Sequence, residues 1–183
     1  MKAHTINNKN NFIAGWYIDT NVCDEIVAKG ETDPAIFAEG IKEYRDYDLK
    51  AFDPTLYEKY VFELFTALEE YKKVYPFSYE QLKQWGLTPP RIQRYDPGKA
   101  YRIAHCENNG SKPVLTRHLA YMTFLNTVED GGGTEFLQQN FTAKAETGLT
   151  LFWPAGWTHY HRGVVSETEV KYIITGWCNF YPD

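Results

Sequence analysis

Residues 53–75 carry the strongest hydrophobic pattern in the first half of the chain. Apolar side chains recur there every three or four positions, which is the spacing of one face of an α-helix. The stripe consists of Leu56, Tyr60, Leu64, Leu68 and Tyr71. Asp53 can cap such a helix, Pro54 suits its first position, and Pro76 lies beyond its end. The pattern therefore predicts an amphipathic helix from Pro54 to about Lys73.

Three further helices are predicted in this half of the chain. One covers residues 22–30, after polar residues that can cap it, and ends at Gly30. A second covers residues 34–47, and a third, short helix begins at a capping box formed by Ser78 and Gln81. The first 89 residues are therefore predicted to be helical.

Beyond Pro90 the pattern changes to short segments rich in β-branched and aromatic residues, separated by turns rich in glycine, proline and asparagine. The predicted strands cover residues 91–95, 100–105, 114–125, 134–137, 141–145, 149–153, 159–165 and 171–180. Closely spaced strands without intervening helices indicate an antiparallel barrel or a two-sheet jelly roll. We therefore expect a mainly β single domain over residues 1–183, in which a β core at 90–183 is braced by helices at 13–89.

Composition supports a packed domain and excludes several other classes of protein. The chain has 14 Tyr, 11 Phe and 5 Trp among 183 residues, whereas disordered chains are poor in such residues. The net charge is −5, and its acidic excess lies in residues 1–89, where 10 Lys and Arg face 15 Asp and Glu. Without a cluster of Lys and Arg, nucleic acid is not an expected partner, because binding phosphates needs concentrated positive charge.

Cysteine usage and the amino-terminal sequence bear on location. The three cysteines, Cys23, Cys106 and Cys178, are too few and too scattered for a disulfide framework. Residues 1–12 lack the apolar stretch of a signal peptide, and no apolar run approaches the length that spans a membrane. We therefore expect a soluble protein of a reducing cytoplasm, with no membrane partner.

Residues that can bind a metal occur in two short motifs of the β half. His105 and Glu107 are two positions apart, so on a strand both side chains project from the same face. His159 and His161 share a face in the same way. Two imidazoles and one carboxylate, with open coordination positions, form the facial triad of non-haem iron(II) oxygenases. The spacing alone leaves open which of the two later histidines takes part.

Lys171 is a cation in an apolar, β-branched strand, ten residues after His161. Burying an unpaired ammonium is costly, so a buried lysine at this position needs an anionic partner. The alternative is a lysine whose head reaches solvent from an outer face of the sheet. Together with a metal triad, Lys171 becomes a candidate partner for a dicarboxylate cosubstrate.

Four segments in this order resemble the 2-oxoglutarate- and iron(II)-dependent oxygenases, and within them the chain is most similar to the prolyl 4-hydroxylase branch. The segments are His105-x-Glu107, EDGGGTEF at 129–136, LFWPAGWTHYHRGVV at 151–165 and KYIITGW at 171–177. The stretch from Tyr95 to Tyr101 also resembles the segment that leads into the first metal histidine in that family. The resemblance covers about residues 91–180 and implies a double-stranded β-helix, which is a jelly-roll fold.

The resemblance implies a catalytic role for four residues. His105, Glu107 and His161 would be the iron ligands, and Lys171 would receive the distal carboxylate of 2-oxoglutarate. His161 is preferred to His159 because the family places the last ligand about ten residues before the basic residue. Iron(II), 2-oxoglutarate, O2 and ascorbate are the implied cofactors and cosubstrates.

Further residues are implied as contacts around this centre. Tyr95, Tyr121 and Thr123 would contact 2-oxoglutarate. Residues that contact the substrate or support the ligands would be Tyr101, Thr134, Phe136, His159, Arg162 and Trp177. Arg162 directly follows a ligand on its strand, so its side chain should face the other way.

Two positions depart from the family pattern. Glu107 stands where the family usually has aspartate. Because glutamate is one methylene longer, its backbone or rotamer must retreat to keep the metal–oxygen distance at roughly 2.0–2.2 Å. Thr123 stands where relatives often have a tyrosine that touches 2-oxoglutarate, so either its hydroxyl or Tyr121, on the same face, would make that contact.

The function implied is hydroxylation of a prolyl residue in a peptide or protein, coupled to decarboxylation of 2-oxoglutarate to succinate and CO2. The same chemistry on another amino-acid side chain or on a small metabolite is an alternative. A third alternative, from a different class, is a jelly-roll binding module without a metal, because a fold alone does not fix a function.

Overall fold

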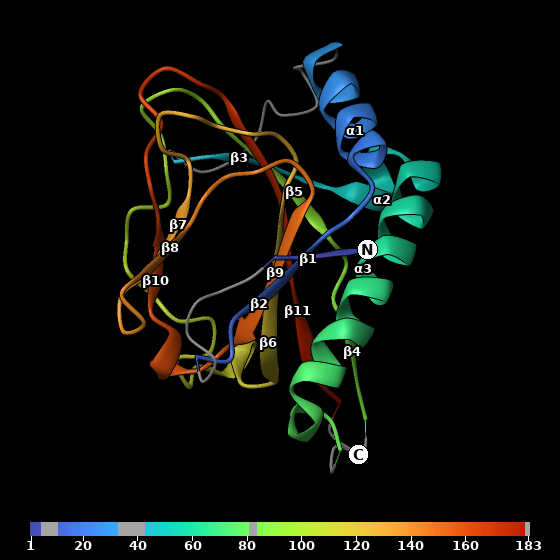
Figure 1. The fold of residues 1–183 in the computed structure, drawn as a ribbon, viewed down its shortest axis with the longest axis vertical. Coiled ribbons are helices and arrows are strands. Elements are labelled where there is room, and N and C mark those ends of the chain that lie inside the picture. The colour runs from blue at the N-terminus through green and yellow to red at the C-terminus, as the bar shows by residue number, and fades with distance from the viewer. Residues whose placement is uncertain (5–10, 33–42, 81–83, 182–183) are drawn as a thin grey trace.

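Two antiparallel sheets lie face to face, and helices cover the outer face of the larger sheet (Figure 1). The computed structural model describes residues 1–4, 11–32, 43–80 and 84–181. Two facing antiparallel sheets are the jelly-roll architecture that the sequence predicts, so the predicted fold class is confirmed. In the part of the chain that the structure describes, no helix is long and apolar enough to cross a membrane.

The larger sheet has the strand order β1-β2-β9-β6-β11-β5-β3, with β4 paired to β11 as a branch. Its strands are β1 (Lys2–His4), β2 (Ala14–Tyr17), β3 (Arg45–Asp48), β4 (Trp85–Leu87), β5 (Arg91–Tyr95), β6 (Arg117–Phe124), β9 (Leu149–Pro154) and β11 (Lys171–Phe180). The smaller sheet has the order β10-β7-β8 and consists of β7 (Thr134–Phe136), β8 (Phe141–Ala143) and β10 (His161–Gly163). All of these pairs are antiparallel.

The alternation of side chains along β11 divides the interior into two cores. Tyr172 and Ile174 face the helices, whereas Ile173 faces the space between the two sheets. Successive residues of a strand point to opposite faces, so one sheet serves both cores. Since Lys171 shares a face with Ile173, the strand places this lysine on the side of the sheet that faces the smaller sheet.

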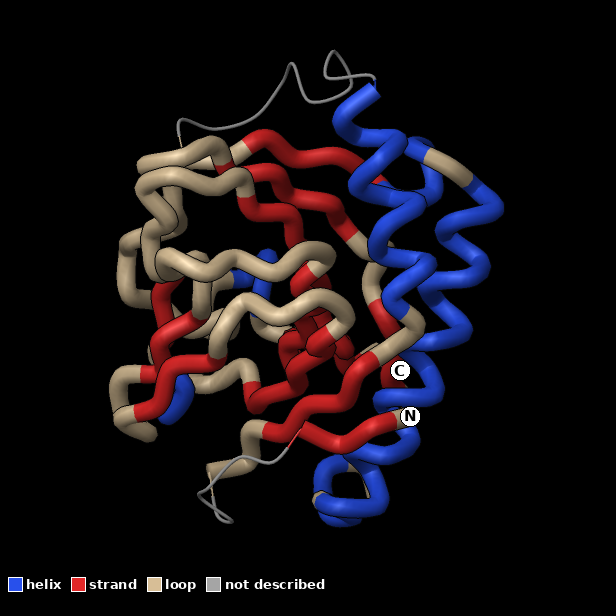
Figure 2. The backbone as a smooth tube through the Cα atoms, turned by 45° about the horizontal axis from the view of Figure 1, so that its top comes forward, coloured by secondary structure: helices blue, strands red, loops and turns tan. Residues whose placement is uncertain are grey.

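Three helices pack as a layer on the outer face of the larger sheet: α1 (Thr20–Thr32), α2 (Leu49–Phe52) and α3 (Pro54–Val74). Figure 2 shows them together on one side of the molecule. The predicted cap of α3 is confirmed, because the Asp53 carboxylate accepts hydrogen bonds from the amides of Thr55 and Leu56. The predicted stripe is also confirmed as the buried face, which consists of Leu56, Tyr60, Leu64, Ala67, Leu68 and Tyr71.

The prediction that residues before 90 form only helices is wrong, because β1 to β4 lie there and join the larger sheet. Of the predicted helix at 34–47, residues 34–42 lie outside the described residues, and residues 45–48 form β3 instead. Pairing with β5 and an ion pair from Arg91 to Asp46 (2.8 Å) hold this strand. The sequence of residues 45–48 alone does not reveal these distant partners, so it predicts a helix where the structure has a strand.

Two shorter segments also differ from the prediction. Gln81 of the predicted capping box lies outside the described residues, and β4 follows where the short helix was expected to end. Residues 100–105 form no regular strand; only His105 pairs, through an isolated bridge to His161. This segment is therefore a loop that β10 holds at two points, through His105 and through the carbonyl of Tyr101, which accepts from the amide of Gly163 at 2.8 Å.

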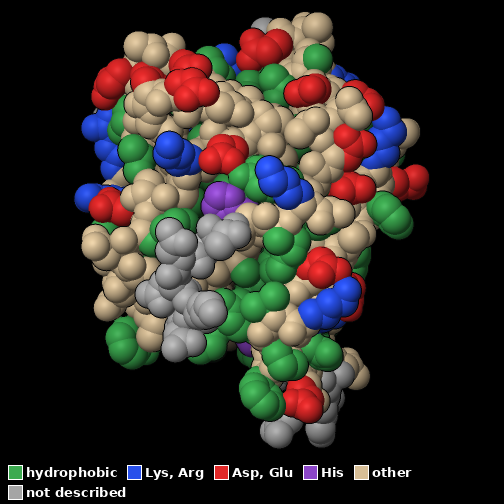
Figure 3. Space-filling model, viewed as in Figure 1, with side chains coloured by type: hydrophobic (Ala, Val, Ile, Leu, Met, Phe, Trp, Pro, Cys, Tyr) green, Lys and Arg blue, Asp and Glu red, His purple; other side chains and the backbone are tan. Residues whose placement is uncertain are grey.

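Acidic and basic side chains are interspersed on the face of the molecule shown in Figure 3. On the helices several of them form ion pairs, such as Lys59 with Glu25 (2.7 Å) and Lys73 with Glu70 (2.6 Å). These partners are exposed, so each pair contributes little to stability. The acidic excess of the first half is therefore a property of solvated surface.

Leu64 allows a direct test of the packing of α3 on the sheet. Its side chain is fully buried, so Leu64→Ala is expected to lower the free energy of unfolding by about 2–5 kcal/mol, through lost burial and the cavity left behind. Phe62 on the same helix is 70% exposed, so Phe62→Ala is expected to change the free energy of unfolding by about 0.5 kcal/mol or less. Urea denaturation of both variants measures the difference; equal losses would contradict this packing.

Candidate active site

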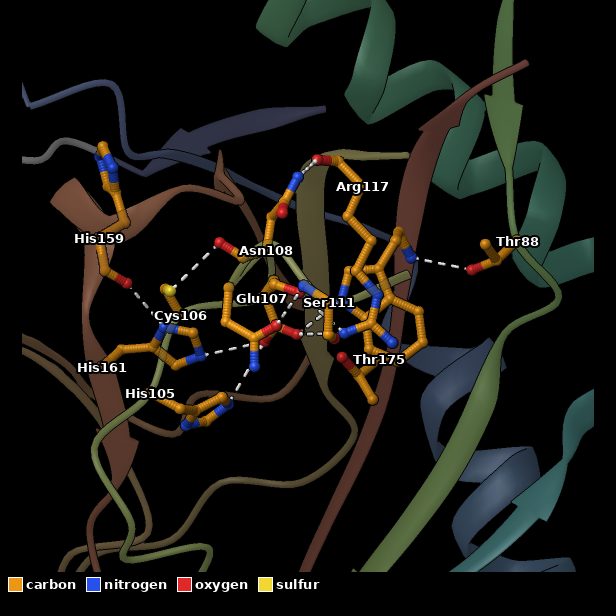
Figure 4. Close-up of polar contacts among 12 residues, drawn as sticks. Thr88, His105, Cys106, Glu107, Asn108, Ser111, Arg117, His159, His161 and Thr175 are labelled. Atoms are coloured by element: carbon orange, nitrogen blue, oxygen red, sulfur yellow. Dashed lines mark hydrogen bonds and ion pairs between the residues drawn. The ribbon is translucent and has the colours of Figure 1, made fainter. Parts of the chain in front are cut away.

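His105 and His161 lie side by side where the loop before Glu107 meets β10. The amide of each residue donates a hydrogen bond to the carbonyl of the other, at 3.0 and 2.9 Å, and the two rings are 4.4 Å apart. Glu107 points back toward both rings, with Oε1 3.2 Å from Nε2 of His161 and 3.5 Å from Nε2 of His105 (Figure 4). The three candidate ligand atoms all lie within 4.8 Å of one another.

Backbone carbonyls fix the orientation of both imidazole rings. Nδ1 of His105 lies 2.9 Å from the carbonyl oxygen of Ile103, and Nδ1 of His161 lies 2.9 Å from that of His159. Because a carbonyl can only accept, each Nδ1 carries the proton and donates it. With a metal bound, each ring would be neutral and would present the lone pair of its Nε2 to the ion. Such hydrogen bonds typically orient metal-binding histidines, so this donor set fits a divalent iron ion.

The charges of the cluster favour a bound cation. Burial raises the pKa of Glu107, but hydrogen bonds from His105 and His161 outweigh burial and hold that pKa well below its usual range. Burial lowers the pKa of His105, but the hydrogen bond and charge attraction to Glu107, together with backbone hydrogen bonds, outweigh burial, so the net shift is upward. The carboxylate thus stays ionised and favours a positive charge beside it. A metal ion would supply that charge and leave the imidazoles neutral.

A cavity of about 290 Å³ opens beside the three residues, between the two sheets. Its wall is built from the inward faces of β5, β6, β9 and β11, from the smaller sheet, and from the segment around residues 101–107. The lining residues are Tyr44, Gln93, Tyr95, Tyr101, His105, Glu107, Arg117, Met122, Thr134, Trp153, His161, Gly163, Lys171, Ile173, Thr175 and Trp177. Half of these residues are aromatic or apolar, and the other half carry polar or charged groups that can orient a ligand.

Lys171 lines this cavity and is only 4% exposed. Its ammonium lies 4.6 Å from the centre of the Tyr95 ring, and among the described residues it forms no ion pair. Burial lowers the pKa of Lys171 to about 8. An ammonium buried without a counter-charge is costly, so the cavity fits a ligand that brings an anionic group to this point.

The inward residues of β11 order the cavity from one end to the other. Lys171, Ile173, Thr175 and Trp177 occupy alternate positions of the strand, and all four line the cavity. At about 3.3 Å per residue, the first and the last are separated by roughly 20 Å along the strand. The cavity therefore has an end at Lys171 and an end at Trp177.

Four of the nine predicted contact residues line the cavity. Those that line it are Tyr95, Tyr101, Thr134 and Trp177. The Tyr101 ring also packs edge-on against His105, with centres 4.6 Å apart. Phe136 is fully buried behind the site, where it contacts the ring of His161 at 5.6 Å. Their predicted roles toward ligands stay predictions.

Tyr121 and Thr123 are not at the cavity, so their prediction as contacts of 2-oxoglutarate is wrong in this structure. The Thr123 hydroxyl lies 2.8 Å from the hydroxyls of Tyr60 and Thr150, and the Tyr121 hydroxyl donates to the carbonyl of Thr88 at 2.9 Å. The physical reason is the phase of β6. These two residues face the helices, and the residue between them faces the cavity.

His159 and Arg162 also lie apart from the cavity lining. The His159 ring is buried, with Nε2 2.7 Å from the carbonyl of Asn11, so its support of His161 comes from its own carbonyl. Arg162 is exposed on the opposite face of β10 and donates to Glu135 at 2.6 Å. Its outward direction agrees with strand alternation, and its inclusion among residues near the substrate or ligands is wrong.

Eight of the sixteen residues that line the cavity are not among the predicted site residues, and four of them show why. Gln93 could have been predicted, because it is two positions from Tyr95 on β5 and so lies on the same face of that strand. Trp153 and Arg117 belong to predicted strands whose inward phase could not be assigned without the sheet. Tyr44 gave no signal, because it precedes a strand that the sequence predicts as helix, yet its ring packs 5.3 Å from that of Tyr95.

Comparison with known proteins agrees with this geometry. Residues 90–179 match the family described as the 2OG-Fe(II) oxygenase superfamily. No curated protein sequence matches the chain. Among solved structures, the viral collagen prolyl hydroxylase vCPH from Paramecium Bursaria Chlorella virus-1, in complex with 2OG, is similar with a TM-score of 0.73 and 16% identity over 94% of this chain and 98% of that one.

A prolyl-4-hydroxylase from Pseudomonas putida is similar to the same degree, with a TM-score of 0.72 and 15% identity over 94% of this chain and 95% of that one. At these identities the likeness shows a shared fold, which is the predicted jelly roll braced by helices. The family match covers the segments that carry His105, Glu107, His161 and Lys171. The match of residues 90–179 to the 2OG-Fe(II) oxygenase superfamily, together with the shared fold, therefore confirms the predicted resemblance to these oxygenases.

Proposed function

We propose that this protein is an iron(II)- and 2-oxoglutarate-dependent dioxygenase that hydroxylates a prolyl residue in a peptide or protein. In the balanced reaction, a C–H bond, O2 and 2-oxoglutarate give an alcohol, succinate and CO2. One observation carries the proposal: two imidazoles and a carboxylate converge beside a cavity that also holds a buried lysine, which has no ion-pair partner among the described residues. A module that merely bound a neutral ligand would need neither feature.

In this proposal His105, Glu107 and His161 hold the iron, and Lys171 binds the distal carboxylate of 2-oxoglutarate. The bound iron supplies the oxidising chemistry, for which the protein contributes position and environment. Tyr95 packs against the Lys171 ammonium at 4.6 Å, so it forms one wall of the cosubstrate end. Ascorbate serves as the reductant that keeps the iron in its divalent state.

The chain's own residues would also keep water out of the cavity. Trp153 and Phe136 are at most 2% exposed and pack around the His161 ring, at 5.0 and 5.6 Å between ring centres. Met122 and Ile173 add apolar surface to the wall. A dry wall of this kind protects a reactive centre from side reactions and strengthens the attraction between Lys171 and a carboxylate.

We place the substrate at the end of the cavity that is opposite Lys171. Trp177 lies there, and the Arg117 guanidinium stacks on its ring at 3.5 Å from the centre. A flat aromatic and cationic surface suits the ring of a prolyl residue and the carbonyls that flank it in a peptide. The names of the two solved relatives, a collagen prolyl hydroxylase and a prolyl-4-hydroxylase, support this choice of substrate.

The experiment is a turnover assay on a library of proline-containing peptides, with iron(II), 2-oxoglutarate and ascorbate. Mass spectrometry should find peptides that gained one oxygen atom on proline, in step with succinate formation. Matched peptides with alanine in place of proline control for the site. Succinate without proline-dependent oxidation would move the activity to another side chain or metabolite, and no succinate at all would overturn the proposal.

A further inference from the structure

Glu107 uses only one of its carboxylate oxygens to face the imidazoles. Its other oxygen, Oε2, accepts a hydrogen bond from the indole Nε1–H of Trp177 at 2.7 Å and one from the Arg117 guanidinium at 3.2 Å. The same nitrogen of Arg117 also donates to the backbone carbonyl of Glu107, at 3.0 Å. Figure 4 shows Arg117 reaching toward the Glu107 carboxylate from the side away from the histidines.

These two donors are themselves held in place. The Arg117 guanidinium stacks on the Trp177 ring at 3.5 Å from its centre. The backbone of Trp177 is fixed by Thr88, whose hydroxyl accepts from the Trp177 amide at 2.9 Å and whose amide donates to the Trp177 carbonyl at 2.8 Å. Trp177 and Arg117 therefore form a rigid support that meets the carboxylate from β11 and β6.

A glutamate needs such a support more than an aspartate does. Its longer side chain has one more rotatable bond, so an unsupported carboxylate can turn both oxygens toward a cation or swing away from it. Glu107 is about one-tenth exposed, and its Oε2 would be left buried without a partner if the two donors were lost. Ligands whose orientation is fixed in advance bind without an ordering cost.

We propose that Arg117 and Trp177 are positioning residues that make Glu107 a one-oxygen metal ligand. They bind Oε2 and so direct Oε1 toward the two imidazoles, which leaves room at the metal for the cosubstrate. They also compensate for the longer side chain of Glu107, which stands where the family usually has aspartate. This inference rests on the proposed metal centre and concerns how that centre is built.

The test measures the binding of Co(II) alone to the metal-free protein, by titration calorimetry and by the visible absorption of the bound ion. Trp177→Phe keeps the aromatic wall and removes only the donor, so it is expected to weaken Co(II) binding about 10- to 100-fold and to change the absorption. Arg117→Met should act in the same direction. The matched control is Trp157→Phe, because Trp157 is 69% exposed and does not line the cavity; it should bind Co(II) as the unmodified protein does.

A double-mutant cycle separates positioning from a general effect on folding. In a Glu107→Asp background the shorter acid cannot face the imidazoles and reach the indole together, so adding Trp177→Phe should cost at most about twofold more. An equal loss in both backgrounds, or tight Co(II) binding by Trp177→Phe alone, overturns the inference and leaves the proposed function standing. If the unmodified protein binds no Co(II), the inference and the proposed function both fail.

Discussion

Replacing His161 by alanine is expected to abolish measurable iron(II) binding and succinate formation while the protein stays folded. His161 supplies one of three candidate ligand atoms, and its Nε2 lies 3.2 Å from the Glu107 carboxylate. Two remaining ligands hold a divalent ion weakly, so the affinity for iron(II) or Co(II) should fall by at least about 100-fold, which is more than the loss of a supporting residue costs. Calorimetric titration with the metal, beside circular dichroism to confirm folding, measures this.

The neighbouring His159 gives the matched control for that prediction. Its ring contacts Asn11 and faces away from Glu107, so His159→Gln should bind the metal within about threefold of the unmodified protein. A loss of metal binding in His159→Gln, with binding retained in His161→Ala, would reverse the assignment of the two histidines.

The second large effect is expected at Lys171. Lys171→Met keeps the apolar stem and removes the charge, so it should weaken binding of 2-oxoglutarate by about 100-fold or more, because one partner of a buried ion pair is then missing. Pyruvate has the same 2-oxo acid but no distal carboxylate, and its binding should be nearly unchanged. Titration of both acids into the Co(II)-loaded protein decides the point. An equal effect on both would remove Lys171 from its role.

The same lysine predicts a pH dependence of cosubstrate binding. Burial lowers the pKa of Lys171 to about 8 in the protein without ligand. The carboxylate binds the charged form, so binding is strongest below that pKa. It should weaken as the pH rises above 8, by up to about tenfold per pH unit. Affinities for 2-oxoglutarate at pH values between 7 and 9.5 test the sign. In Lys171→Met the slope should vanish.

The metal cluster was accessible from sequence because its geometry is local. His105 and Glu107 are two positions apart, which on a strand predicts side chains on one side, and in the structure both side chains do converge, although Glu107 lies in a bend. The same spacing, between His159 and His161, marks the second motif. The spacing alone does not choose between His159 and His161. The order of the segments along the chain, which resembles an oxygenase family, is what groups the two motifs into one site and selects His161. The long helix α3 was accessible for a similar reason, because its stripe repeats within a single element.

The errors share another cause, which is that they depended on partners far away in the chain. Residues 117–124 predict a strand, but nothing in them indicates which face meets the helices, so the prediction places Thr123 and Tyr121 on the wrong side. Residues 45–48 became a strand because β5 lies beside them. Tyr44 lines the cavity because it directly precedes the strand that this pairing creates. A strand inside a sheet with two buried faces has no polar side to reveal its phase.

By itself, therefore, the sequence determined the chemistry of this protein: two imidazoles, a carboxylate and a lysine in an order that implies a jelly roll and an iron-dependent oxygenase. Those properties depend on residue types and short spacings along the chain, which are known before the fold is known. Only the tertiary structure decided which strand face lines the cavity, that Lys171 is buried without an ion-pair partner among the described residues, and that Arg117 and Trp177 support Glu107. Each of these depends on contacts between elements that lie far apart in sequence, and such contacts exist only after the sheets have packed.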